Sequence, residues 1–132
     1  MTKELWLNLP VKDIQKSKEF FSGIGFSFNN DRESETMAAM MVGKKKVPVM
    51  LFEENRFKNV IQHNVTDTKK SSEIMISFDA ESREEVDELA EKIEKAGGNV
   101  FSSPGDIQGW MYGCAFTDLD GHRWNILYMD RQ

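Results

Sequence analysis

The sequence predicts an α+β fold made of two tandem βαβββ modules, each a strand, a helix and three further strands. The first observation is that the same order of patterns, an alternating apolar segment, an amphipathic helix and short strands, occurs twice along the chain. The second is that matching features recur about 70 to 76 positions apart, as with Asp13 and Ser82 or Gly25 and Gly98. A ferredoxin-like α+β sandwich is the alternative, and it predicts fewer strands after each helix.

The first module begins with a strand at 5–9, where Leu5, Leu7 and Leu9 alternate with Trp6 and Asn8. The leucine face of this strand should meet a helix. That helix is expected to start after the N-cap Asp13 and to end at Gly23 and Gly25. Strands are predicted at 26–28, 36–42 and 47–52, followed by a polar connector with a short helix at about 57–61.

The second module repeats this order from a strand at 74–78. Its helix is marked by the capping box Ser82-Arg83-Glu84-Glu85 and ends at Gly97-Gly98. Strands are predicted at 100–101, 112–117 and 123–129, the last two joined by the tight turn 118–121.

We expect one domain over residues 1–132, with module one at about 4–53, a connector at 54–72 and module two at about 73–130. The net charge of −5 argues against nucleic acid, which is bound through clustered Lys and Arg. No apolar run approaches the roughly 20 residues that span a bilayer. No signal segment opens the chain and Cys114 is its single cysteine, so a reducing, cytoplasmic location is expected.

Three segments resemble, in order and spacing, the motifs of the glyoxalase, bleomycin-resistance and extradiol-dioxygenase (vicinal oxygen chelate) superfamily. They are Asn8-Leu9-Pro10-Val11-Lys12-Asp13, Gly23-Ile24-Gly25-Phe26 and Asp118-Leu119-Asp120-Gly121-His122, in which Leu119 and His122 depart from the family pattern. The resemblance covers nearly the whole chain. It implies a curved, mostly antiparallel eight-stranded sheet around a central cavity, a homodimer, and metal ligands near the start and end of each module.

At the positions that the resemblance assigns to metal ligands, this chain has Trp6, either Val49 or Met50, Glu73, and Asn125. An indole cannot ligate a metal, and the amide and apolar groups do not suit a hard divalent ion. The sequence therefore predicts no conventional metal site and no cofactor. A rearranged site from His63 and Glu73 stays open if the connector folds over the cavity.

Strand parity places one set of side chains on the face opposite the helices, toward the expected cavity. Trp110 and Tyr112 are expected on a Gly-flanked loop able to cover its mouth. The predicted ligand-binding residues are Trp6, Asn8, Met50, Met75, Ser77, Trp110, Tyr112 and Asn125. Glu73 is the candidate catalytic acid or base; the alternative is a solvated carboxylate at the rim. Cys114 is interpreted as a small buried residue rather than a nucleophile.

Three functions remain open from the sequence. The leading hypothesis is a metal-independent protein that binds a small apolar or aromatic molecule. The alternative is a divalent-metal-dependent lyase, isomerase or dioxygenase with a rearranged ligand set. The third is an interaction or structural role, in which Trp6 fills a vestigial pocket.

Overall fold

A computed structural model describes residues 1–130 of the chain, which divides into two compact units, Met1–Thr66 and Asp67–Gln132. We call them the first and the second unit and describe each by itself. Within residues 1–130 no helix is long and apolar enough to cross a membrane.

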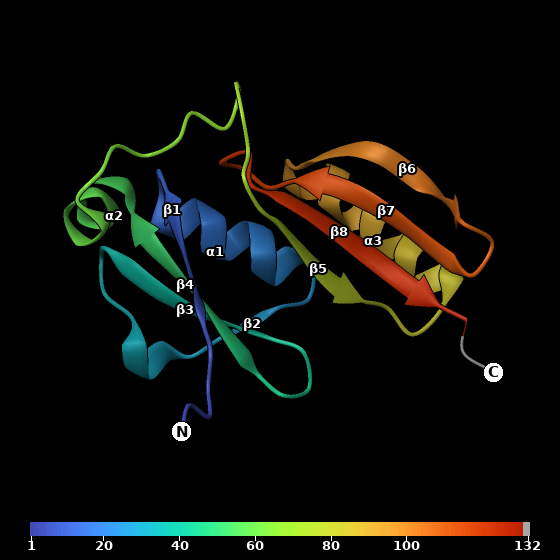
Figure 1. Cartoon of the computed structure of the whole chain (residues 1–132), viewed down its shortest axis with the longest axis horizontal. Helices are drawn as coiled ribbons and strands as arrows, with labels where there is room; N and C mark the ends of the chain where they lie inside the picture. The colour runs from blue at the N-terminus through green and yellow to red at the C-terminus, as the bar shows by residue number, and fades with distance from the viewer. Residues whose placement is uncertain (131–132) are drawn as a thin grey trace. The chain divides into compact units, whose positions relative to one another are not determined.

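The first unit is a four-stranded mixed sheet with the order β1-β4-β3-β2 (Figure 1). β1 pairs with β4 in parallel, and the other pairs are antiparallel. Its elements are β1 (Leu7–Val11), α1 (Ile14–Gly23), β2 (Ser27–Phe28), the 3-10 helix η1 (Asn30–Arg32), β3 (Met37–Val42), β4 (Val47–Glu53) and α2 (Glu54–Ile61).

The second unit has the equivalent strand order, β5-β8-β7-β6, with β5 parallel to β8 and the other pairs antiparallel. Its elements are β5 (Met75–Asp79), α3 (Arg83–Ala96), β6 (Asn99–Ile107), β7 (Met111–Thr117) and β8 (Arg123–Met129). Both α1 and α3 are followed by three strands, which confirms the predicted βαβββ repeat over the ferredoxin-like alternative.

The two main helices begin where the sequence predicts. The Asp13 side chain accepts a hydrogen bond from the Lys16 amide at 3.0 Å, and the Ser82 hydroxyl accepts one from the Glu85 amide at 3.0 Å. The returning half of the predicted capping box differs, because the Glu85 carboxylate accepts from the amide of Glu81. α3 ends at Gly97, whose φ of 102° is easy only for glycine.

Each unit has its own apolar core between its helix and one sheet face. In the first unit Phe20 and Phe21 of α1 are buried together with Leu51 of β4. In the second, Trp124 of β8 stacks on Phe116 of β7 with ring centroids 6.2 Å apart, and both are fully buried. Burial on this scale is the main favourable term in folding.

The observed strand boundaries differ from the predicted ones in two places. β1 and β5 begin at Leu7 and Met75, so Leu5 and Ile74, which were predicted to face helices, precede the strands and are exposed. β6 extends to nine residues although only Val100 and Phe101 were predicted. Its pairing with β7 carries register shifts between Val100 and Ser102 and between Ser102 and Gly105, so β6 is an irregular edge strand.

Candidate functional site

Each sheet has one face that packs on its helix and an opposite face, which we call the open face. In the first unit the register aligns Leu9, Leu51 and Ala38 in one row, and all three are buried on the helix side. Successive side chains of a strand alternate between faces, so the neighbouring row, Asn8, Met50 and Ala39, lies on the open face.

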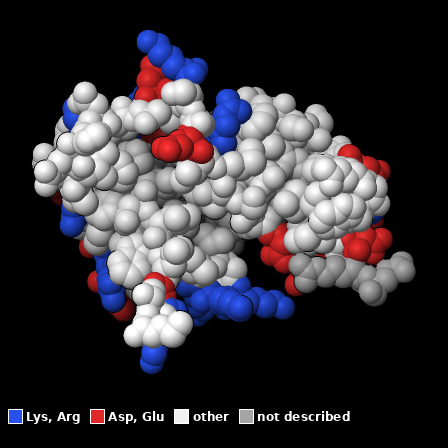
Figure 2. All heavy atoms as spheres, viewed as in Figure 1, with Lys and Arg blue, Asp and Glu red and all other residues white. Residues whose placement is uncertain are grey.

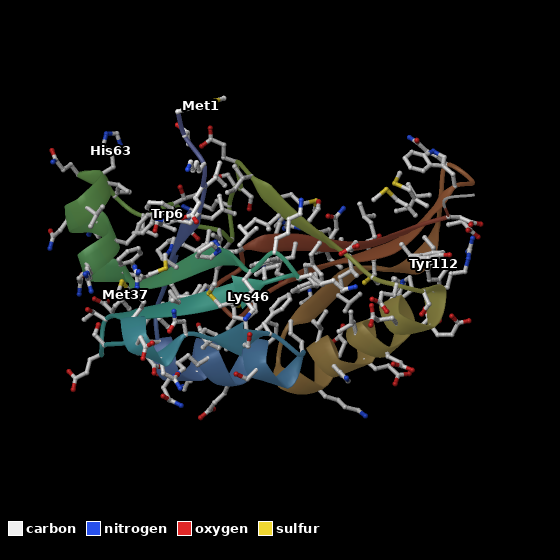
Figure 3. All side chains as sticks on the ribbon, turned by 90° about the horizontal axis from the view of Figure 1, so that it is seen from below. Met1, Trp6, Met37, Lys46, His63 and Tyr112 are labelled. Atoms are coloured by element: carbon white, nitrogen blue, oxygen red, sulfur yellow. The ribbon has the colours of Figure 1, made fainter. Side chains whose placement is uncertain are left out.

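The open face of the first unit carries mainly sulfur-containing and aromatic side chains around this row. Met37 and Met41 lie two residues from Ala39 along β3, and Phe52 lies two residues from Met50 along β4. Trp6 precedes β1, is 55% exposed and lies on the side of the sheet away from α1 (Figure 3). Figure 2 shows few charged side chains in the middle of this surface. Parity along β3 was the sequence signal that could have found Met37 and Met41.

The corresponding row of the second unit is Ser77, Asn125 and Ala115. The Ser77 hydroxyl donates a hydrogen bond to Oδ1 of Asn125. One step along the sheet, Gly113 is covered by the side chain of Leu127, which a Cβ at position 113 would meet at 2.8 Å. The open face of the second unit thus combines the hydrogen-bonded amide of Asn125 with the aliphatic side chain of Leu127.

The register resolves the choice between Val49 and Met50, because Val49 is buried on the helix face and Met50 lies on the open face. Trp6, Asn8, Met75, Ser77 and Asn125 also lie on or beside the open faces of their own units, as parity predicts. Their roles in binding stay predictions.

Glu73 is placed differently from its expected position. It lies in a bend two residues before β5 and is exposed, which matches the alternative of a solvated carboxylate. Trp6 stands seven residues before the helix cap Asp13, and the residue seven before the cap Ser82 is Met75. Met75, rather than Glu73, is therefore the repeat counterpart of Trp6.

Trp110 and Tyr112 were expected together on a loop, and they separate. Trp110 lies in the turn between β6 and β7 after Gly109 and is half exposed. The strand predicted at 112–117 is confirmed, and the loop placement of Tyr112 is wrong, since it belongs to β7 and its hydroxyl donates to Asp87 of α3 at 2.6 Å. That hydrogen bond raises the pKa of Tyr112, and the guanidinium of Arg83 lies 5.0 Å from the ring centroid. Tyr112 faces α3 because it stands at an even spacing from the buried Cys114.

The two histidines and the cysteine occupy positions outside the open-face rows. His63 is exposed in the turn after α2, and the backbone N–H of His122 donates to Asp118 at 3.0 Å. Cys114 is buried, as predicted, in register with the buried Ile126. Burial raises the pKa of the Cys114 thiol to about 11, so very little reactive thiolate exists near neutral pH.

A buried carboxylate that the sequence reasoning missed organises the turn before β8. Asp118 accepts hydrogen bonds from the backbone amides of Asp120 and His122 at 2.9 and 3.0 Å, and from Nε1 of Trp124 at 3.0 Å. Burial raises the pKa of Asp118, an effect that the charge of His122 and these three donors partly offset. This role is structural, and the Asp-x-Asp-Gly turn motif was its sequence signal.

The donors at the implied metal-ligand positions do not fit a hard divalent ion. In the first unit Trp6 and Met50 offer an indole and a thioether, and in the second Asn125 offers a neutral amide already bonded to Ser77. Within residues 1–130 no three His, Cys, Asp or Glu side chains are grouped closely enough to hold a metal ion.

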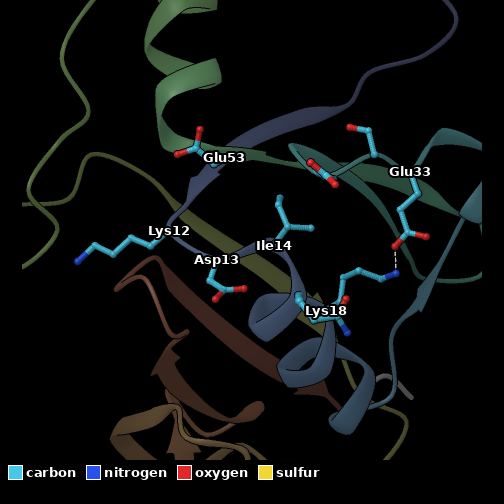
Figure 4. Close-up of a pocket in the computed structure, with 9 residues that line it drawn as sticks. Lys12, Asp13, Ile14, Lys18, Glu33 and Glu53 are labelled. Carbon is cyan, nitrogen blue, oxygen red and sulfur yellow. Dashed lines mark ion pairs between the residues drawn. The ribbon is translucent and has the colours of Figure 1, made fainter.

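A hollow of about 750 Å³ in the first unit lies beside the start of α1 (Figure 4). Four carboxylates line it, and three of them, those other than Glu35, have local partners. Asp13 caps α1, Glu53 accepts from the Asn55 amide at the start of α2, and Glu33 pairs with Lys18. These three carboxylates therefore have roles in the local structure.

Comparison with known structures gives the fold a context. A hypothetical protein from S. aureus, SA1046, is similar at 38% identity and a TM-score of 0.85, covering 96% of this chain and 94% of that one. A glyoxalase-related enzyme from Fulvimarina pelagi has a TM-score of 0.83 at 16% identity, covering 96% and 88%. The fosfomycin resistance protein FosX from Listeria monocytogenes has a TM-score of 0.73 at 19% identity, covering 100% and 94%. The last two show the fold alone.

A search of curated proteins found no match. The sequence profile of the Glyoxalase/Bleomycin resistance protein/Dioxygenase superfamily matches residues 5–126. The repeat, the strand order and this match together show that the chain belongs to the glyoxalase/bleomycin resistance protein/dioxygenase superfamily.

Proposed function

We propose that this protein binds a small apolar or aromatic molecule against an open sheet face without using a divalent metal. The observation that carries the proposal is the row Asn8, Met50 and Ala39, bordered by Met37 and Trp6. Small-molecule sites are typically apolar and aromatic with a few polar groups that set orientation. Thioethers suit this role because they are flexible and make favourable contacts with aromatic rings.

Polar residues on each open face would orient a ligand bound to that face. In the first unit Asn8 supplies an amide, and in the second Ser77 and Asn125 supply a hydroxyl and an amide. The half-exposed Trp110 offers a further aromatic surface. Amides and hydroxyls fix orientation without the desolvation penalty of a buried charge.

The test is a fluorescence titration with N-phenyl-1-naphthylamine, a neutral aromatic probe. We expect saturable binding by the wild type and about tenfold weaker binding by Met50→Asp, because a carboxylate on this face disfavours an apolar ligand. Lys45→Ala, in the exposed turn between β3 and β4, is the control with unchanged affinity. Absence of saturable binding by the folded wild type would contradict the proposal.

The alternative enzyme is separated by a metal titration of the same preparation. A metal-dependent lyase, isomerase or dioxygenase using Glu73 and His63 requires Mn²⁺ or Zn²⁺ to raise the thermal midpoint, since binding to the native state stabilises it. Glu73→Ala would abolish that rise. We expect no rise in either protein.

We also propose that the protein is a cytoplasmic homodimer. The edge strands β1 and β5 have sheet neighbours on one side only within their own units, and pairing with a second copy is one way to protect such edges. Sedimentation equilibrium checks this, and a monomeric mass at micromolar concentration would refute it.

A further inference from the structure

The open face of the second unit contains a row of small and polar side chains that crosses β5, β8 and β7 and continues to Ser102 of β6. Ser77 of β5, Asn125 of β8 and Ala115 of β7 are neighbours in register. Ser77 is exposed, Asn125 is half-buried and Ala115 is buried. Of these three, only Asn125 can both donate and accept through an amide.

Larger side chains border this row on both sides. Met75, Arg123 and Thr117 form the next row in one direction. In the other direction the next row is Asp79, Leu127 and Gly113, and an added Cβ at Gly113 would clash with the Leu127 side chain. A ligand seated over the small row would therefore contact Leu127 while facing Asn125, with the exposed carboxylate of Asp79 at the β5 end of this border.

The Asn125 amide is oriented by its neighbour. The Ser77 hydroxyl donates to Oδ1 of Asn125, so the oxygen end of the amide is directed at Ser77 in this structure. Within residues 1–130, Nδ2 of Asn125 has no acceptor of its own. The amide therefore presents N–H donors to whatever occupies the row.

The nearest cationic donor in the neighbouring row is differently engaged. The guanidinium of Arg123 lies 4.4 Å from the ring centroid of Phe101 on β6, in a cation-π contact. The guanidinium keeps its N–H donors in this contact, but its charge favours an anionic acceptor, whereas the neutral amide of Asn125 suits a neutral oxygen.

We propose that Asn125, oriented by Ser77, selects ligands that carry a neutral oxygen acceptor, such as an aryl ketone, over hydrocarbons of the same shape. Asn125 is the specificity-determining residue and Ser77 is a positioning residue that acts through it. This inference rests on the proposed binding of an apolar or aromatic molecule and adds the functional group that the ligand must present.

The test uses two probes of the same skeleton, acetophenone and α-methylstyrene, which differ only in C=O against C=CH₂. Their dissociation constants are measured by ¹H–¹⁵N NMR titration of each variant. The two probes differ in hydrophobicity, but this difference affects every variant equally. A change in the ratio of the two dissociation constants between variants therefore reports the contact with the C=O group. In the wild type we expect acetophenone, and not α-methylstyrene, to shift the Asn125 side-chain amide signals, which are identified by their loss in Asn125→Asp.

Asn125→Asp keeps an oxygen acceptor for Ser77 and removes the N–H donors, so we expect the ratio to move about tenfold against the ketone, the scale of one well-placed hydrogen bond. Ser77→Ala should move it part of the way, and Ser77→Thr, which retains the hydroxyl, should restore it. Asn64→Asp, the same change at an exposed site in the first unit, should leave it unchanged. Arg123→Met tests the competing cation and should also leave it unchanged.

The outcomes separate the two proposals. If both probes bind and the ratio is the same in wild type and Asn125→Asp, this inference is overturned while the proposed function stands. If Arg123→Met produces the shift instead, the donor is wrongly assigned. If neither probe binds to the folded wild type at millimolar concentration, the proposed function fails and this inference fails with it.

Discussion

The two units follow one backbone plan and differ in the chemistry of their open faces. The row Asn8, Met50 and Ala39 in the first unit occupies the same register positions as Ser77, Asn125 and Ala115 in the second. Alanine stands at the same end of both rows. The amide, however, moves from the first strand of the module to the last, and a flexible thioether takes its place in the first unit.

This difference shows which face of the sheet the fold depends on. The helix-facing rows are apolar and buried in both units, because they form the core. The open faces contribute less to each core, so their side chains can differ without loss of the repeat. The alanines Ala39 and Ala115 are themselves buried on these faces.

Two further differences concern the ends of the strands. The turn before β8 is held by the buried Asp118, whereas the turn before β4 runs from Gly43 to Lys46 through positive φ angles of 77° and 53° at its ends. In addition, Met37 of the first unit corresponds to Gly113 of the second, because each stands two residues before the alanine of its row. Four predictions use these differences.

Asp118→Ala should have the largest effect, since it leaves Nε1 of the buried Trp124 and two backbone amides without their acceptor. We expect a loss of about 3 kcal/mol in the free energy of unfolding. Urea denaturation followed by tryptophan fluorescence measures it. Lys45→Ala in the turn of the first unit should change it by less than about 0.5 kcal/mol, and equal losses in both would remove the contrast between the turns.

Gly113→Ala should come next, because the added methyl would meet the backbone oxygen of Ile126 and the side chain of Leu127. We expect about 2 kcal/mol of destabilisation from overpacking. The counterpart Met37→Ala removes a partly exposed side chain and should cost less. Thermal and chemical denaturation of both variants decide the order, and a neutral Gly113→Ala would show that the strands relax around the methyl.

Lys46→Gly should stabilise the first unit by a few tenths to about 1 kcal/mol. The left-handed conformation of Lys46, with φ of 53°, costs an ordinary residue about 1 kcal/mol. Glycine avoids this cost but loses more conformational entropy on folding, which offsets part of the stabilisation. Differential scanning calorimetry measures the change. A lower midpoint for Lys46→Gly would indicate that the lysine side chain contributes more than its backbone strain costs.

The smallest expected signal is a pH dependence that belongs to the second unit. Burial raises the pKa of Asp118 in the folded state, so the folded protein binds this proton more tightly than the unfolded chain. The stability of the wild type relative to Asp118→Asn should therefore be greatest below about pH 4, the ordinary range of aspartate, and fall as pH rises through the folded-state pKa. If the stability of the wild type relative to Asp118→Asn instead increased with pH, the three hydrogen-bond donors would lower the pKa of Asp118 by more than burial raises it.

The sequence was sufficient for the two main helices, α1 and α3, and for the parity of the strands, whereas α2 begins three residues before the predicted position and η1 was not predicted. Asp13 and Ser82 marked the starts of α1 and α3 because side-chain caps are local, and the alternation in β1 and β5 placed Asn8 and Ser77 on the open faces because the period of a strand is fixed. Parity fails for residues just before a strand. It predicted that Leu5 and Ile74 are buried, but both precede the first paired residue of their strands and are exposed.

The misplacements had different causes. The loop placement of Tyr112 conflicted with the strand predicted at 112–117; β7 begins at Met111, and the hydroxyl of Tyr112 donates to Asp87 on α3. Glu73 was assigned by the family resemblance, whereas counting back seven residues from Ser82 leads to Met75. The three donors that converge on Asp118 depend on a turn geometry that the order of residues alone does not fix.

The outermost strand of the second sheet also bears on how the protein behaves when it is concentrated. β6 is nine residues long, which is enough to template the addition of foreign strands and the growth of fibrils. Pro104 removes one backbone donor from it, and the register shifts around Ser102 interrupt its regular ladder. An edge interrupted in this way is poorly suited to adding strands in register, so its irregularity disfavours the growth of amyloid.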